Sequence, residues 1–551
     1  MRTFWTTFYS YKGGVGRSMA LSNIAALLVQ KGRRVVLIDF DLEAPGLDSF
    51  SEFSAASGKR GVVEYVAKFR KNKIAPDIKQ FVHACELPGP LPGKLWVMPA
   101  GKKDASYNRE RTALDWEGLY ESGLGEPFVE NWKASIAAHF QPDYVLVDSR
   151  TGLTDVAGVC TLHLPDLVVM LFGLNDQNVR GIAAVAKTIR EADHNRIPQI
   201  HYVASPVPNI PTDKNGPLIE RFAAAATNLG VKLESLIRYS SQVALHEELF
   251  VLQDSTVESQ LSRDYKALLS RLINYNRNGL DFLSIQVDEI VKSGETGRSD
   301  KLYSLLEREF SGRADAVFLL SRLRLASGER AEAAQLAENA LLLDPSHTES
   351  YLWLLAHYNN EHKPAESLRV CNLVVSHSEL IGKKRLMDIH QQRGIAALAC
   401  EDSVVAIDSF TLCIPPKDEK PTPSPANLMV AKFNLAEAQR RNRVLLSADV
   451  WREIVGLFEQ AGQSSESQLP TQANQLQAIH IAYALSGDLV RAREVLTKAK
   501  QAADLLGDIE DLFSVKTYQN VSQPEFLKFN KEMLAALDHG MLWDGFPISQ
   551  P

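Results

Sequence analysis

Six short apolar runs, separated by stretches with helical periodicity, constrain the fold of the first half of this chain more than any other feature. They are FWTTFYS (4–10), RVVLIDF (34–40), LWVMPAG (95–101), YVLVDS (144–149), DLVVMLFG (166–173) and IHYVAS (200–205). Strands that are apolar throughout belong in a parallel sheet with helices on both faces. The sequence therefore predicts an α/β fold with a three-layer parallel sheet, whose ligand site lies at the carboxyl ends of the strands.

A glycine-rich loop, YKGGVGRS (11–18), follows the first run and precedes the helical stretch MALSNIAALLVQKG. Glycines 13, 14 and 16 allow the backbone to curl so that its N–H groups face phosphate oxygens, and the helix adds its positive N-terminal end. Ser18 offers a hydroxyl to Mg²⁺. Two acidic segments, DFD (39–41) and DSRTG (148–152), follow other strands. The combination predicts a nucleotide-phosphate and magnesium site.

The residues Tyr11 to Ser18 resemble the deviant Walker A motif of the ParA/MinD family of P-loop ATPases. VVLIDFDLEAPGLD and PDYVLVDSRTG are similar to the second acidic element and the Walker B strand of that family, and further segments follow in the family's order over about residues 1–275. The spelling KGGVGR resembles a variant subgroup that is often joined to helical repeats. The resemblance implies a P-loop NTPase domain that uses ATP and Mg²⁺.

The resemblance also implies roles for individual residues. Lys12 matches the signature lysine, which reaches the partner's phosphates across a nucleotide-sandwich homodimer. Asp41 matches the aspartate that positions the attacking water, although an aspartate here could instead be a turn or helix-capping residue. Ser18, Asp39 and Asp148 match the groups that hold the metal. The nucleotide-binding loop would consist of Gly13, Gly14, Val15, Gly16, Arg17, Ser18 and Met19.

Arg17 stands where the family usually has lysine, and we count it among the candidate catalytic residues. Arginine keeps the charge and can contact phosphate through two nitrogens, but its guanidinium is larger and planar, so the replacement is not conservative. The loop glycines, Ser18 and the three aspartates are all present. We interpret the site as modified but working, with tight ATP binding and slow hydrolysis; turnover well above about 1 s⁻¹ would contradict this.

The identity of the base rests on the resemblance alone. The adenine is expected near VASPVPN (203–209) and IRYSSQ (237–242). Ser205 stands where family members often have asparagine. Asn209 could take that part or could cap a turn, so GTP stays open as an alternative to ATP.

After about residue 280 the strand pattern gives way to pairs of Ala- and Leu-rich helical segments. Ala333, Ala337 and Ala340, followed by Pro345, resemble the second helix of a tetratricopeptide repeat, which has a period of about 34 residues. Similar units are expected in 350–376, 390–413 and 478–504, while a non-repetitive helical domain is the alternative. The predicted organisation is an ATPase domain at 1–275, all-α tetratricopeptide-like repeats at 276–414, a Pro-rich hinge or loop at 415–425, and further repeats with a C-terminal tail at 426–551.

Charge and composition exclude several partners. The chain has a net charge of −7, and residues 1–275 carry 31 Lys and Arg against 30 Asp and Glu, so the acidic surplus lies in the second half. That half is not expected to bind nucleic acid. No apolar run approaches the roughly 20 residues of a membrane span, and the first residues do not resemble a signal peptide. Five scattered cysteines indicate reduced thiols, and we expect a cytoplasmic protein without a membrane partner.

The leading hypothesis is an ATP-dependent switch that dimerises through its nucleotide site and binds an unidentified protein partner through its helical repeats. Cargo positioning, regulation and a role in phage defence all stay open within it. A scaffold with a non-hydrolysing pocket is one alternative. ParA-like positioning on DNA is less favoured and would use the basic residues Lys59, Arg60, Lys68, Arg70, Lys71 and Lys73. A bacterial tyrosine kinase is disfavoured, because Tyr518 is the only tyrosine after residue 500.

Overall fold

The computed structural model describes residues 2–89, 91–152, 158–192, 196–209, 216–244, 247–253, 258–294, 296–414, 424–462, 469–505, 513–515 and 519–548. The chain divides into two compact units, Met1–Ser293 and Gly294–Pro551.

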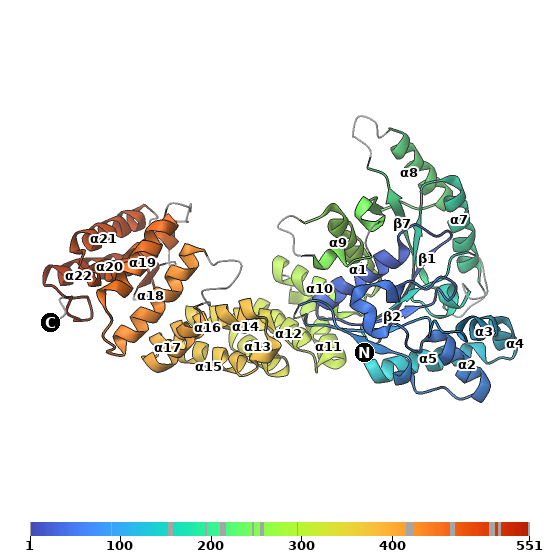
Figure 1. The fold of residues 1–551 in the computed structure, drawn as a ribbon, viewed down its shortest axis with the longest axis horizontal. Coiled ribbons are helices and arrows are strands. Elements are labelled where there is room, and N and C mark those ends of the chain that lie inside the picture. Colours follow the sequence, from blue (N-terminus) through green and yellow to red (C-terminus); the bar gives the residue numbers. More distant parts are fainter. Residues whose placement is uncertain are drawn as a thin grey trace. The chain divides into compact units, whose positions relative to one another are not determined.

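The first unit is built on an eight-stranded sheet with the strand order β3-β4-β2-β5-β1-β6-β7-β8 (Figure 1). Its strands are β1 (Phe4–Ser10), β2 (Arg34–Asp39), β3 (His83–Cys85), β4 (Lys94–Met98), β5 (Tyr144–Asp148), β6 (Leu167–Phe172), β7 (Gln199–Val207) and β8 (Ser235–Arg238). All neighbours pair in parallel except β3 and β4. The predicted parallel sheet is confirmed.

Two short edge strands, β3 and β8, were not predicted from the sequence. Strand β3 has three residues and pairs antiparallel to β4. A parallel pair needs a crossover of about a dozen residues or more, and only residues 86–93 separate these strands. The short connection therefore accounts for the antiparallel edge.

Helices cover both faces of the sheet (Figure 1). Their bounds are α1 (Arg17–Gln30), α2 (Val62–Asn72), α3 (Tyr107–Thr112), α4 (Trp116–Glu121), α5 (Gly125–Phe140), α7 (Asp176–Glu191), α8 (Gly216–Leu229), α9 (Gln260–Leu272) and α10 (Leu280–Ser293). Phe4 and Phe8 of β1 pack in one core with α1 and α9. Trp5 packs with α2 and α5 on the other face, and Tyr9 packs there with α7 and α8. The alternation along β1 thus produces the predicted three layers.

Helix α10 belongs to the first unit, which therefore extends past the boundary predicted at residue 275. Asp281 of α10 is 5% exposed, and its Oδ2 lies 3.0 Å from Nε of Arg33. The same oxygen accepts a hydrogen bond of 3.0 Å from the hydroxyl of Tyr144 in β5. These buried polar contacts join α10 to the sheet. They correct the sequence boundary, because periodicity does not reveal which domain a helix packs against.

The second unit is almost entirely helical, as predicted. Its helices are α11 (Ser299–Phe310), α12 (Ala314–Ala326), α13 (Arg330–Leu343), α14 (Thr348–Asn360), α15 (Pro364–Val375), α16 (Lys383–Ala399), α17 (Ser403–Leu412), α18 (Pro425–Arg441), α19 (Ala448–Gly462), α20 (Leu469–Leu485), α21 (Leu489–Asp504) and α22 (Gln523–Asp538). A two-stranded antiparallel ribbon, β9 (Phe513–Val515) and β10 (Gln519–Val521), lies between the last two and departs from an all-α domain.

Small residues allow successive helices of this unit to pack closely. Ala333, Ala337 and Ala340 of α13 are fully buried. A Cβ added to Gly394 in α16 would lie 2.5 Å from the ring of Phe410 in α17, so only glycine fits there. The paired helices agree with the predicted units, while their identity as tetratricopeptide repeats stays a prediction. The predicted hinge at 415–425 lies outside the described residues, apart from Ser424 and Pro425, which begin α18.

No helix in the described part of the chain is both long and apolar enough to cross a membrane.

Candidate functional site

The glycine-rich loop connects the end of β1 at Ser10 to the start of α1 at Arg17. Gly14 and Gly16 have φ values of 78° and 76°, the left-handed region that glycine adopts without strain. Gly13 and Gly14 are exposed, and among the described residues no atom beyond the adjoining residues lies within 4 Å of the position that a Cβ would take on either. The loop therefore has the conformation and the open space that a phosphate group requires.

The two predicted acidic segments meet beside this loop. Asp39 and Asp148 are the last residues of β2 and β5, and they are direct partners in the parallel register. Strand β5 lies between β2 and β1, and in its pairing with β1 Asp148 lies opposite Phe8. Asp41 follows two residues after Asp39. The topology therefore brings the three aspartates and the loop to one edge of the sheet.

Arg17 forms ion pairs with two of these aspartates. Its Nε donates to Oδ1 of Asp148, and its Nη2 donates to Oδ2 of Asp41 over 2.7 Å. The arginine is 8% exposed and Asp148 is 1% exposed, so the ion pairs are buried. We predicted from the sequence that Arg17 contacts the phosphates, whereas here its guanidinium lies between the acidic groups. A planar guanidinium with several donors can contact both carboxylates at once.

The buried charges shift the pKa values in this site. Burial raises the pKa of Asp39 well above its usual range, and the neighbouring charge of Asp148 adds to that rise. Burial also raises the pKa of Asp148, although the charge of Arg17 opposes it. Burial alone would lower the pKa of Arg17, but the charges of Asp148 and Asp41 outweigh it and hold that pKa above its ordinary value. Among the described residues, three buried aspartates thus lie around one buried cation, Arg17.

The residues present fit a magnesium ion and a phosphate. Oδ2 of Asp148 and Nη1 of Arg17 are buried and lack a hydrogen-bond partner among the described residues. The Ser18 hydroxyl interacts with Asp148. No cluster of three or more His, Cys, Asp or Glu with the geometry of a metal site occurs in the described residues. Magnesium suits such a sparse set, because it is usually held by one or two carboxylates together with water and phosphate oxygens.

The other predicted loop residues differ in accessibility. Lys12 is partly exposed and makes no hydrogen bond or ion pair within the described part of the chain. Val15 and Met19 are buried in the core under the loop, so their side chains are not available to a ligand. Ser205 donates a hydrogen bond of 2.8 Å to the carbonyl of Val15. Asn209 donates to the carbonyl of Tyr239 over 3.0 Å. Ser205 thus links β7 to the loop, and Asn209 links the segments that follow β7 and β8.

A family model described as the CobQ/CobB/MinD/ParA nucleotide binding domain matches residues 6–292, more than half of the chain. The chain belongs to this family. The matched region ends within one residue of the first compact unit, which agrees with the placement of α10 in that unit.

Several solved structures are similar to this domain. The cell division ATPase MinD of Pyrococcus furiosus is 16% identical, with 50% of this chain and 99% of that chain covered and a TM-score of 0.36. A ParA family ATPase from Chlorobium tepidum is 16% identical, with 49% and 98% covered and a TM-score of 0.37. The septum site-determining protein MinD of Pyrococcus horikoshii, complexed with Mg-ADP, is 15% identical, with 49% and 96% covered and a TM-score of 0.35. Comparison with curated proteins finds no match.

Two features of the nucleotide-binding domain were not predicted from the sequence. A Cβ added to Gly181 of α7 would lie 2.2 Å from the ring of Tyr11, so this glycine makes room for the first residue of the loop. Glu43, in the loop after β2, pairs with Arg150 over 2.6 Å and with Arg111 over 3.2 Å. Arg150 follows the β5 strand end, so this pair joins the two acidic loops. Neither contact has a signal in a single sequence, because each depends on residues far apart in the chain.

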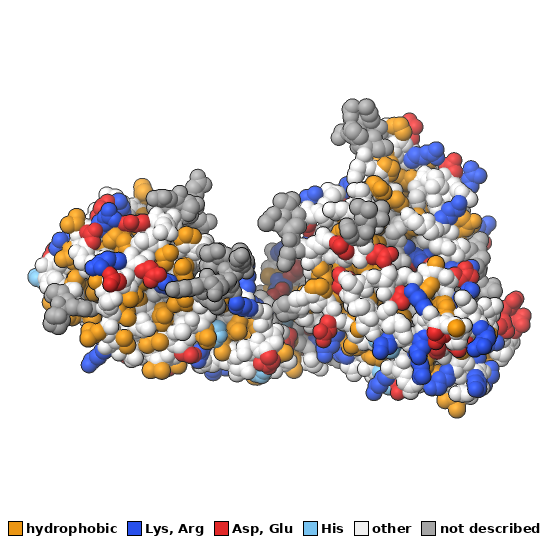
Figure 2. All heavy atoms as spheres, in the orientation of Figure 1, with side chains coloured by type: hydrophobic (Ala, Val, Ile, Leu, Met, Phe, Trp, Pro, Cys, Tyr) orange, Lys and Arg blue, Asp and Glu red, His pale blue; other side chains and the backbone are white. Residues whose placement is uncertain are grey.

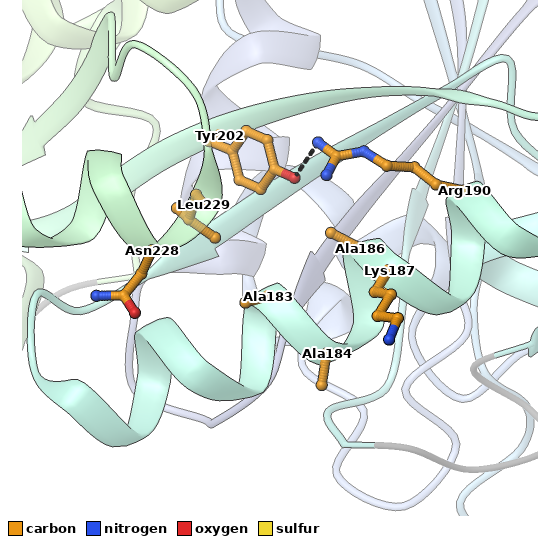
Figure 3. Close-up of a pocket in the computed structure, with 8 residues that line it drawn as sticks. All are labelled: Ala183, Ala184, Ala186, Lys187, Arg190, Tyr202, Asn228 and Leu229. Atoms are coloured by element: carbon orange, nitrogen blue, oxygen red, sulfur yellow. Dashed lines mark hydrogen bonds between the residues drawn. The ribbon is translucent and has the colours of Figure 1, made fainter.

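A pocket of about 400 Å³ lies elsewhere in the nucleotide-binding domain, between α7, α8 and the middle of β7 (Figure 3). Arg190 of α7 and Tyr202 both line it, and Arg190 donates a hydrogen bond of 2.9 Å to the Tyr202 hydroxyl. None of the loop residues or the three aspartates lines it. The pocket is therefore separate from the candidate nucleotide site.

The basic residues of the DNA-binding alternative lie on and around α2. Figure 2 shows basic side chains gathered over this part of the first unit, with acidic ones among them. Arg70 pairs with Asp115 over 3.7 Å, and Lys68 lies 6.0 Å from the centre of the Phe81 ring. Arg70 and Lys68 therefore make contacts within the fold, and this does not favour the use of the basic cluster as a DNA-binding surface.

Proposed function

We propose that this chain is an ATP-binding and slowly hydrolysing switch that dimerises through its nucleotide site and binds a protein partner through its helical unit. The observation that carries the proposal is the register of β2 and β5, which places Asp39 and Asp148 side by side next to a glycine loop in the conformation for binding phosphate. The family supplies nucleotide binding. ATP, magnesium, hydrolysis and dimerisation are the parts that we propose.

Each residue of the site has a proposed task. The backbone of Gly13–Ser18 would hold the phosphates, and Ser18, Asp39 and Asp148 would hold Mg²⁺, which supplies positive charge against the phosphate oxygens when bound. Asp41 would orient the attacking water. Lys12 would reach the partner's nucleotide, which agrees with a side chain that is partly exposed and makes no hydrogen bond or ion pair with the other described residues.

Arg17 explains why hydrolysis would be slow. In the structure its guanidinium holds Asp41 and Asp148, the residues proposed to position water and metal. Breaking buried ion pairs is costly, since each charge then loses a partner in a poorly solvated environment. Arg17 must release these carboxylates before Asp148 can hold the metal and Asp41 can orient the water. We propose that this exchange limits the rate at which the site becomes active.

The helical unit is the proposed partner-binding region. Stacked helices form extended surfaces that bind peptides or other domains. Several large apolar side chains are exposed on this unit, including Leu352, Val404 and Leu445. Such side chains are suited to burial against a partner.

The solution mass of the protein tests the switch. Light scattering with Mg·ATP and with Mg·ADP would use an Asp41→Ala variant to block turnover. We expect the mass to double with ATP only, and Lys12→Ala to abolish the doubling while ATP still binds. A mass that ignores nucleotide in both forms would contradict the sandwich dimer. Because Asp41 also contacts Arg17, the unmodified chain must be measured in parallel with a non-hydrolysable ATP analogue.

A scaffold with an inactive pocket is the second candidate, and the ion pairs of Arg17 favour it. A guanidinium that never leaves Asp41 and Asp148 would exclude the metal. Thermal unfolding distinguishes the two candidates, because a ligand that binds only the folded state raises the unfolding midpoint. A rise with Mg·ATP supports the switch, and an unchanged midpoint at millimolar Mg·ATP supports the scaffold.

A further inference from the structure

The pocket between α7, α8 and β7 has the size and the lining of a site for a small molecule (Figure 3). Its volume of about 400 Å³ lies in the range of pockets that hold small organic ligands. Three alanines of α7 and Leu229 of α8 make up the apolar part of its lining, and Lys187, Arg190, Tyr202 and Asn228 make up the polar part. A mostly apolar lining with a few polar groups is typical of ligand pockets.

Small side chains on α7 create the apolar part of the pocket. Ala183 and Ala186 are three residues apart, so their methyl groups lie on the same side of the helix. Ala186 is 1% exposed and Leu229 is 5% exposed, and both belong to the core that α7 and α8 form against the sheet. The pocket therefore extends down to the core, and the short alanine side chains leave room there for a flat apolar group.

Arg190 brings a positive charge to this pocket. Its Nη2 donates 2.9 Å to the hydroxyl of Tyr202, and it forms no ion pair with a carboxylate among the described residues. Burial raises the pKa of Tyr202, although the charge of Arg190 opposes this rise, so the hydroxyl stays protonated and neutral. The hydroxyl accepts from Arg190 and donates to no described residue, which leaves its own hydrogen for a ligand.

Lys187 brings a second positive charge. Its Nζ lies 3.9 Å from Oε1 of Glu191, and these side chains are 73% and 65% exposed. An exposed ion pair of this length contributes little, so a ligand can replace the glutamate at low cost. The lining of the pocket contains no acidic residue. Two cations without an acid in the lining suit an anionic group, which forms charge-assisted hydrogen bonds with such donors.

We propose that this pocket binds a small organic anion, whose carboxylate or phosphate group contacts Arg190 and Lys187 and whose flat apolar body lies against the alanines of α7 and Leu229. The site is separate from the proposed nucleotide switch, because none of the loop residues or the three aspartates lines it. Binding here requires no nucleotide, so a failure of this site and a failure of the ATP switch can be told apart.

Fluorine NMR of para-fluorobenzoate tests this site on the full-length, nucleotide-free chain. The fluorine line of a small ligand broadens when the ligand exchanges with a protein site, and we expect saturable broadening at millimolar concentrations. Arg190→Gln should weaken the affinity at least about fivefold, because it removes the charged donor but keeps a polar group beside Tyr202. The neutral analogue para-fluorobenzamide should bind the unmodified chain at least about fivefold more weakly than para-fluorobenzoate does.

Matched controls separate the pocket from the surface around it. Arg180→Gln removes an exposed arginine of α7 outside the pocket and should bind para-fluorobenzoate like the unmodified chain. Ala183→Met fills the apolar part of the pocket and should weaken binding at least about tenfold. Ala223→Met makes the same change at an exposed position of α8 outside the pocket and should have no effect. If Ala183→Met fails to fold, Arg190→Gln and the neutral analogue still decide.

A second arm distinguishes carboxylates from phosphates. It uses para-fluorophenyl phosphate in a Gly14→Ala background, because the glycine-rich loop of the unmodified chain is itself a candidate phosphate site. Binding that Arg190→Gln weakens in this background assigns phosphates to the pocket as well. Binding of para-fluorobenzoate alone assigns the pocket to carboxylates.

Three results would overturn the proposal. The first is the absence of saturable broadening with either anion. The second is equal affinity of Arg190→Gln and the unmodified chain, which would leave the anion without its main contact. The third is equal affinity of Ala183→Met and the unmodified chain, which would place the anion on the outer surface of α7 instead of in the pocket.

Discussion

Nη2 of Arg17 lies 2.7 Å from Oδ2 of Asp41, and the same guanidinium also contacts Asp148. One side chain of the phosphate loop therefore holds the two acidic groups that the family resemblance assigns to water and metal. A lysine ammonium is a compact point charge on a flexible stem, which cannot reproduce the fixed fork of a guanidinium. The arginine thus gives this site a resting arrangement that follows from its shape as well as its charge.

Arg17→Lys should loosen this arrangement. We expect the variant to lower the unfolding midpoint of the nucleotide-free chain, since a hydrogen bond to a charged group contributes roughly 1.5–3 kcal/mol. Its Mg·ATP-induced rise in midpoint and its turnover should both increase, because the carboxylates are released more easily. Thermal unfolding and phosphate release measure these effects. Arg33→Lys, at another buried pair of the same unit, is the control that should destabilise the chain without raising turnover.

Gly14→Ala should abolish nucleotide binding at a modest cost in stability. The position has a φ of 78°, and no described atom beyond the adjoining residues lies within 4 Å of an added Cβ, so the cost is the backbone strain of about 1 kcal/mol. Gly123→Ala is a matched control, with a φ of 72° and the same open surroundings away from the loop. Both variants should lose similar stability, and calorimetric titration should show ATP binding in the control alone. If both variants bind ATP equally well, the glycine-rich loop is not part of the nucleotide site.

Gly181→Ala should weaken nucleotide binding through Tyr11. The added Cβ would overlap the Tyr11 ring at 2.2 Å, so the tyrosine and the start of the loop must move. We expect ATP affinity to fall by about tenfold or more, which corresponds to about 1.4 kcal/mol. In a double-mutant cycle, Gly181→Ala should cost little in a Tyr11→Ala background. Additive losses would show that the two residues act separately.

His201 should make the first unit less stable in mild acid. Burial lowers its pKa from 6.5 to about 4, and its ring lies between the hydroxyls of Tyr275 and Ser235. Between pH 6.5 and about 4, His201 therefore binds a proton in the unfolded chain but stays neutral in the folded chain. The contribution of His201 to the free energy of unfolding is fully present above pH 6.5. It falls by about 3 kcal/mol at most as the pH drops towards 4. His201→Gln should have a shallower loss between those pH values, and equal slopes of unfolding midpoint against pH would contradict this.

A fragment of residues 1–293 should fold, whereas residues 1–275 should not form a stable domain. The shorter fragment lacks Asp281, the carboxylate that contacts Arg33 and Tyr144 in the interior. Removing one partner of a buried ion pair typically costs about 3–5 kcal/mol. Circular dichroism and proteolysis would compare the two fragments. If the two fragments are equally stable, the domain boundary predicted at residue 275 is correct.

Sequence patterns were sufficient for the architecture of the first unit and for its loop. Apolar runs, glycine spacing and an acidic residue after a strand are local signals, and each reports a local requirement: burial, a positive φ, or a position at a strand end. The edge strands β3 and β8 have only three and four residues, and this is too short for periodicity to reveal. Helix α10 has a clear helical periodicity, but this pattern does not indicate whether the helix packs in the first or the second unit.

The sequence by itself determined which residues could form a phosphate site: the glycines of 13–16, Ser18 and the three aspartates, each marked by the strand or helix beside it. Only the tertiary structure decided how they pair. Arg17 and Asp148 are 131 positions apart, Tyr11 meets Gly181, and Asp544 meets Arg440, each across a fold that brings distant segments together. Local sequence preferences determine where helices and strands form. Whether the buried Arg17 guanidinium contacts a phosphate or a carboxylate depends instead on which groups the folded chain places close to it.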